Sequence, residues 1–170
     1  MKLINILFFH FFVLTTLCFA QSPYAPWAKL SGSAPDKINA REYPVPSKSE
    51  VNVSPYPGAV LTSVSAPRQD TTMYEKEVLP FVALVTTDSP DKVINFYKKL
   101  LTPDKGWNYS QEYTTFVKGE IISALSGFVP SVAVRDENGD DHDLVYVDEN
   151  LKKELKTRIR IFYKPDKTKE

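Results

Sequence analysis

The sequence predicts an α+β fold, with a single antiparallel sheet of about five to six strands and one main amphipathic helix packed on one face. Short β-branched and aromatic segments recur along the chain and end in an alternating run at 158–163. One segment, 89–101, has the apolar spacing of a helix. Asn138-Gly139 lies between two β-branched runs, which is typical of a hairpin.

The first twenty residues have the three parts of a secretory signal peptide. Lys2 gives a positive start, residues 6–19 form an apolar run, and Ala20 is a small residue suited to cleavage. The run is shorter than the roughly 20 residues that span a bilayer. We therefore expect a Sec-type signal, cleavage after Ala20, and a periplasmic or secreted protein with no stable membrane span. An uncleaved anchor and a lipid anchor on Cys18 are the alternatives.

Cleavage would change the chemistry of the chain. It removes Cys18, the only cysteine, so the mature protein must fold without disulfides. It also removes Lys2, which leaves 20 basic and 21 acidic side chains. A nearly neutral chain gives no support to nucleic-acid binding, which needs a clustered basic excess. Partners are expected among unknown proteins or envelope components.

Residues 21–55 are predicted to form a proline-rich extended arm, because prolines disfavour helices and central strands. The arm also carries aromatic residues, including Trp27. It is either a plain linker or an arm that docks, and Trp27 is a candidate binding residue in the second case. The α+β domain is predicted to span 56–165, and a flexible tail 166–170.

The domain begins with a predicted strand at 59–65, a polar loop at 66–76 and a buried strand at 78–86, with Pro80 at its entry. The helix follows. Ser89 is suited to the N-cap and Pro90 to the first helical position. Its apolar positions follow the i, i+3, i+4, i+7 template: Val93, Phe96, Tyr97, Leu100 and Leu101.

Six elements are predicted after the helix. We expect a strand at 107–117 and a short one at 120–125. A hairpin would pair 132–135 with 144–147 through Asn138-Gly139. A short helix at 149–156 would follow Asp148 and turn its leucines inward, and 158–163 would form the last strand.

Catalytic groups are scarce in the mature chain. His142 is its single histidine and lies in a predicted hairpin loop, a poor place for a preorganised base. No spacing marks a pair of carboxylates in an apolar setting. Whether the protein is an enzyme therefore stays uncertain, and the sequence leans against it.

An acidic segment in that loop is a candidate cation site. Oxygen-rich loops suit Ca²⁺, although the EF-hand pattern fails here because Gly139 comes one position before Asp140. The same residue types are also common in turns, so a plain acidic turn is the alternative. The candidate ligands are Asp136, Asn138, Asp140, Asp141, His142 and Asp143.

Three stretches resemble a pattern of small exported bacterial proteins that are largely uncharacterised. They are Tyr56-Pro57-Gly58-Ala59, then residues 86–99 (TTDSPDKVINFYKK), and Gly106-Trp107. The pattern reads YPGA, TxDSP[ED]KVxxFYKKxL and GW, and covers about 56–107. The resemblance implies a bacterial origin and a compact α+β unit. It transfers no catalytic residue.

The leading hypothesis is a non-enzymatic binding or envelope-assembly module. Tyr97 and Trp107 could line a binding groove, although both also suit a hydrophobic core. The alternatives are a carboxylate-dependent hydrolase acting on envelope polymers and a weak divalent-ion-binding protein that uses residues 136–143.

Overall fold

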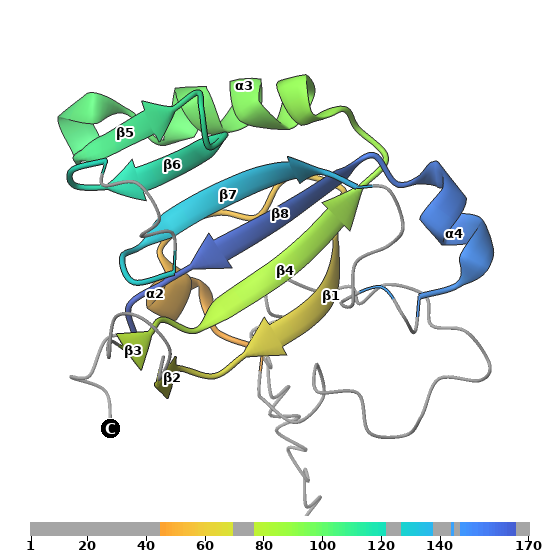
Figure 1. Ribbon diagram of the computed structural model, residues 1–170, viewed down its shortest axis with the longest axis horizontal. Helices are drawn as coiled ribbons and strands as arrows, with labels where there is room; N and C mark the ends of the chain where they lie inside the picture. The colour runs from red at the N-terminus through yellow and green to blue at the C-terminus, as the bar shows by residue number, and fades with distance from the viewer. Residues whose placement is uncertain (1–44, 70–76, 122–126, 138–143, 145–146, 166–170) are drawn as a thin grey trace, which may run out of the picture.

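The computed structural model describes residues 45–69, 77–121, 127–137, 144 and 147–165. Figure 1 shows a six-stranded antiparallel sheet in the order β1-β4-β8-β7-β6-β5. These strands are β1 (Val60–Ser65), β4 (Phe81–Thr86), β8 (Thr157–Phe162), β7 (Ser131–Asp136), β6 (Thr115–Lys118) and β5 (Trp107–Ser110). The main helix α3 (Pro90–Leu100) packs on one face. The predicted α+β fold is confirmed.

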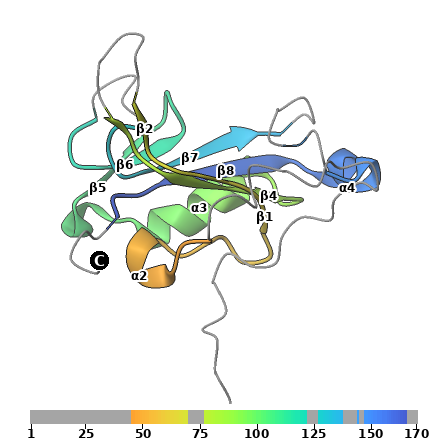
Figure 2. The same ribbon diagram turned by 90° about the horizontal axis from the view of Figure 1, so that it is seen from below.

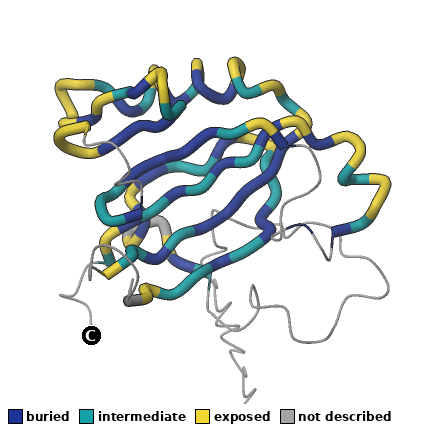
Figure 3. Tube along the Cα trace, viewed as in Figure 1, coloured by how far each residue is buried: buried dark blue, intermediate teal, exposed yellow. Residues whose placement is uncertain are grey.

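Strand register sorts the side chains onto two faces. Leu84 of β4 lies opposite Leu61 of β1 and Ile159 of β8, and Ile159 lies opposite Val134 of β7. These four side chains are buried in the main core, on the same face as Tyr97 of α3. Figure 3 shows the buried segments concentrated in the central strands.

The opposite face has a smaller core at one end. Val85 packs there with Leu144, Val147 and Leu155, next to helix α4 (Glu149–Glu154). Asp148 caps this helix, accepting hydrogen bonds from the backbone N–H groups of Asn150 and Leu151. The predicted short helix after Asp148 is therefore confirmed, although it ends at Glu154, and Leu155 is buried as predicted.

The chain before Tyr56 belongs to the fold. Residues 45–57, which we call the strap, include the short helix α2 (Lys48–Val51). Val51 and Val53 are buried in the main core together with Tyr56. Figure 2 shows α2 on the same side of the sheet as α3. The predicted domain boundary at Tyr56 is therefore too late, because the prolines of this segment obscured its buried valines.

Two predicted strands are interrupted. Residues 78–86 divide into β3 (Glu77–Val78), which pairs with β2 (Arg68–Gln69), and β4, with Pro80 between them. Residues 107–117 form a hairpin, in which Trp107 lies opposite Lys118 and Ser110 opposite Thr115. Thr114, in its turn, has φ 44°, a left-handed conformation that residues other than glycine seldom adopt.

The predicted hairpin between 132–135 and 144–147 is wrong. Strand β7 pairs with β6 on one side and with β8 on the other, and neither partner is the segment predicted for the hairpin. Leu144 and Val147 pack in the smaller core instead. The local Asn-Gly signal could not reveal that a strand from much later in the chain takes the place beside β7. Within the described residues, no helix is both long and apolar enough to cross a bilayer.

Candidate functional site

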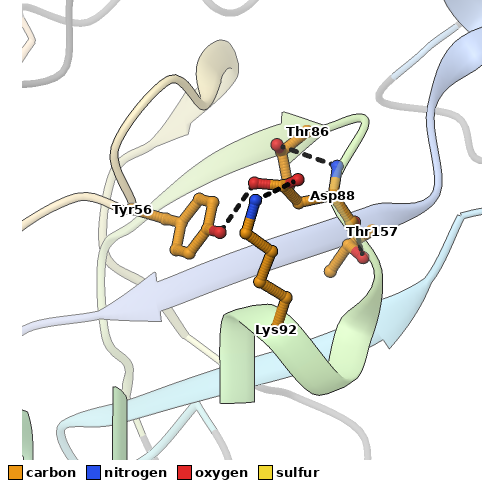
Figure 4. A network of polar contacts seen from close by, with 5 residues as sticks. All are labelled: Tyr56, Thr86, Asp88, Lys92 and Thr157. Carbon is orange, nitrogen blue, oxygen red and sulfur yellow. Dashed lines mark hydrogen bonds and ion pairs between the residues drawn. The ribbon is translucent and has the colours of Figure 1, made fainter. Parts of the chain in front are cut away.

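The strap meets the start of α3 through a polar network (Figure 4). The Tyr56 hydroxyl donates to Oδ2 of Asp88 at 2.7 Å, and Nζ of Lys92 donates to Oδ1 at 2.7 Å. The backbone N–H of Asp88 donates to Oγ1 of Thr86, and Oγ1 of Thr157 donates to the Asp88 carbonyl at 2.6 Å. The network therefore joins the strap, β4, α3 and β8 at one point.

The pKa values of the network favour stable hydrogen bonds between its side chains rather than proton transfer. Hydrogen bonds from Lys92 and Tyr56 lower the pKa of Asp88 below its ordinary value. Burial and the neighbouring Asp88 carboxylate raise the pKa of Tyr56 to about 12. Tyr56 thus stays protonated at neutral pH, and both Asp88 oxygens already accept a hydrogen bond. We interpret the network as a clamp that fixes the strap against the sheet.

A hollow of about 500 Å³ lies beside this clamp, between the strap and the outward face of α3. The edge of the Tyr56 ring meets the Phe96 ring at a centroid distance of 5.2 Å. Lys92 and Lys99 add charge at the rim, although Lys92 already pairs with Asp88. The lining residues are Tyr56, Pro57, Lys92, Asn95, Phe96 and Lys99.

A second hollow, of about 290 Å³, lies where α3 ends. We call it the Trp107 hollow, and it is more enclosed than the first. A short 3₁₀ helix, η1 (Pro103–Lys105), and Gly106 in the left-handed conformation (φ 78°) lead the chain from α3 into β5. The lining residues are Asn52, Val53, Ser54, Leu100, Leu101, Lys105, Trp107 and Lys118.

Local structure places the charged groups of this hollow. Lys118 lies directly opposite Trp107 in the β5–β6 hairpin, so both side chains stand on the same face of the sheet. Nζ of Lys105 donates to the carbonyl of Leu100 at 3.2 Å, near the negative end of the helix. Lys118 makes no ion pair with the described residues.

One contact separates the two hollows. The hydroxyl of Tyr97 donates to the carbonyl of Ser54 at 3.3 Å, and its side chain is 0% exposed. The two hollows therefore lie along one seam between the strap and α3. The residues that line them, all within the described part of the chain, include four lysines and neither aspartate nor glutamate.

The predicted binding residues have different places. Trp107 lines its hollow, although only 7% of it is exposed. Tyr97 is fully buried and lines neither hollow, so the predicted groove does not bring these two side chains to one surface. Trp27 lies outside the described residues. Sequence reasoning missed Lys105 and Lys118, because Lys118 joins the site only through the register of a hairpin that was not predicted.

Of the predicted cation ligands, only Asp136 lies in the described part of the chain, where it is exposed at the end of β7. Asn138, Asp140, Asp141, His142 and Asp143 lie outside the described residues. Among the residues described, no group of three or more acidic, histidine or cysteine side chains is suited to a metal ion. A Ca²⁺ site at 136–143 stays a prediction.

A partly buried charge cluster lies on the face of the sheet away from α3. Arg135 and Arg158 are cross-strand partners, and Arg160 is two positions further along β8. Nε of Arg158 lies 4.0 Å from Oε2 of Glu137, whose side chain is 0% exposed. Burial and the neighbouring arginines lower the pKa of Arg158. We interpret this cluster as part of the internal structure of the sheet.

No known protein family matches this chain. The curated proteins and the solved structures give no match either. The function is therefore inferred from the residues of the seam.

Proposed function

We propose that this chain is an exported binding module of the bacterial envelope, without catalytic activity, that holds its ligand in the seam between the strap and α3. Export is inferred from the first twenty residues, and the envelope and bacterial setting from the resemblance described above. The observation that carries the proposal is the Trp107 hollow, where an aromatic residue and two lysines line one space.

Binding fits the groups in the seam better than hydrolysis does. A hydrolase that uses two carboxyl groups needs them about 5–10 Å apart beside its substrate. Among the described residues that line the two hollows there is no carboxyl group. Lysine ammonium groups, an asparagine amide and aromatic rings are suited to hold an anionic or amphipathic ligand.

The experiment passes saccharide and peptide fragments of envelope polymers over immobilised residues 21–170. A seam variant, Lys99→Glu with Lys118→Glu, reverses one charge in each hollow. The matched control, Lys153→Glu with Lys164→Glu, makes the same charge change at exposed lysines away from the seam. We expect that the wild type and the control retain a fragment that the seam variant loses, and that mass spectrometry recovers this fragment intact.

Three results would contradict the proposal. The first is that the wild type retains no fragment. The second is that the seam variant retains a fragment as well as the control does, and the third is that the fragment is recovered cleaved. The proline-rich arm is tested separately by deleting residues 21–44. A deletion of 21–55 would also remove Val51 and Val53 from the core and could not distinguish lost binding from lost folding.

A further inference from the structure

The Trp107 hollow is lined by both apolar and polar residues. Val53, Leu101 and Trp107 are the buried apolar ones. Asn52 and Ser54 bring an amide and a hydroxyl from the strap. A saccharide ring has the same division, because its C–H groups form apolar faces and its hydroxyl groups form a polar edge.

Two lysines from separate elements line the hollow. Lys105 comes from η1, after α3, and Lys118 comes from β6. One hydrogen bond of Lys105 goes to the Leu100 carbonyl, and an ammonium group has three N–H donors, so two remain. An anion in the hollow would therefore meet donors from two elements.

The volume limits the size of the ligand. About 290 Å³ lies at the lower end of the range for small-molecule pockets, roughly 300–1,000 Å³. The space suits one substituted ring rather than a chain of rings. The hollow beside Phe96 is wider, and one of its two lysines, Lys92, already pairs with Asp88.

We infer that the Trp107 hollow binds one anionic saccharide ring, with its carboxylate or phosphate near Lys105 and Lys118 and its apolar face toward the buried side chains, Trp107 among them. This inference rests on the proposed function and names the class of ligand. A uronic acid and a sugar phosphate share this chemistry, and Asn52 and Ser54 would bind ring hydroxyls in either case.

The experiment uses residues 21–170 carrying Trp27→Phe, so that Trp107 is the only tryptophan. Glucuronate, glucose 6-phosphate, neutral glucose and inorganic phosphate are titrated against Trp107 fluorescence and by calorimetry. We expect at least one anionic sugar to shift the Trp107 emission. Glucose and inorganic phosphate should bind at least about ten-fold more weakly, because each lacks half of the recognised chemistry. The preferred anionic sugar distinguishes a carboxylate ligand from a phosphate ligand.

Charge-removing variants locate the site. Lys105→Gln and Lys118→Gln should each weaken binding about five-fold, the size expected for one partly exposed ion pair. Lys153→Gln, on α4, is the matched control and should leave the affinity unchanged, and Lys99→Gln reports whether the ligand lies in the other hollow. Thermal melting of each variant shows whether it is folded. Added salt should weaken the binding of the wild type.

Each contrary result overturns the inference. Glucose that binds as well as the anionic sugars removes the role of charge, and a loss with Lys99→Gln as large as that with Lys118→Gln places the ligand in the other hollow. If no probe binds while the seam variant of the preceding experiment still loses its fragment, the ligand class is wrong and the proposed function stands. If that fragment is not retained by the wild type either, both fail.

Discussion

The Tyr56 hydroxyl donates a hydrogen bond of 2.7 Å to the Asp88 carboxylate, across 32 positions of the chain. Replacing Tyr56 by Phe removes this bond and leaves the ring in place. We expect a loss of about 1.5 kcal/mol in the free energy of unfolding, the usual cost of a hydrogen bond to a charged group. Urea titration of residues 21–170 measures it. Tyr113→Phe is the control and should change stability by much less, and equal losses would rule out a clamp.

The same pair predicts how stability depends on acid. Because the pKa of Asp88 is lowered in the folded state, its stabilising effect is complete above the ordinary aspartate pKa of about 3.9. The effect disappears as the pH falls below that value and through the lowered pKa. In Asp88→Asn the acid decline should therefore be shallower. Urea midpoints between pH 2 and 6 measure it, and an unchanged slope would contradict the role of Asp88.

High pH should also lower the stability of the fold, in this case through deprotonation of Tyr56. The folded pKa of Tyr56 is about 12, against an ordinary value of about 10, so the folded state holds its proton more tightly. The stabilising contribution of Tyr56 is therefore complete below about pH 10 and is lost as the pH rises toward 12. Burial raises the pKa of Tyr163 to about 12 as well, so Tyr163 should add to the same loss of stability in alkali. Urea midpoints between pH 9 and 12 should fall less steeply in Tyr56→Phe than in the wild type, and identical slopes would refute the assignment.

Because the valines of the strap differ in burial, shortening them should lower the stability of the fold by different amounts. Val51 is 4% exposed in the main core, whereas Val45 is only partly buried against it. Val51→Ala should lower the free energy of unfolding by about 2 kcal/mol, and Val45→Ala by less, because it removes less buried surface. Chemical denaturation of both variants tests this. A Val51 variant as stable as the wild type would show that the strap does not belong to the core.

Two acidic side chains each lie near a basic side chain but differ in how far they are buried. Glu137 is 0% exposed beside Arg158, whereas Glu149 is 73% exposed beside Lys152. Glu137→Ala should cost about 3 kcal/mol because it leaves arginine charge in a poorly solvated place, and Glu149→Ala should cost less than about 0.5 kcal/mol. Thermal and urea unfolding of the two variants compare them directly. Similar losses would contradict the internal role of Glu137.

The starts of the helices could be predicted from the sequence, because they depend on residues that are neighbours in the chain. Pro90 takes the first helical position of α3 as predicted, because this effect acts within one turn. Ser89 stands at the N-cap, although its side chain makes no capping hydrogen bond. The pairing of β7 with β8 could not be predicted in this way, because it depends on a strand that comes later in the chain. The Trp107 hollow depends on a turn at Thr114 that has no glycine or asparagine to mark it.

The place of β8 has a consequence for how the chain acquires its structure. It comes last of the described strands, yet it lies between β4 and β7 in the sheet. A growing polypeptide that ends before Thr157 can form the β1–β4 pair and the β7-β6-β5 unit, but it has no strand to join them into one sheet. Such late, long-range closure makes folding slow and postpones it until synthesis is nearly finished. A translocation machinery that accepts only unfolded chains would therefore meet this protein in a form that it can thread.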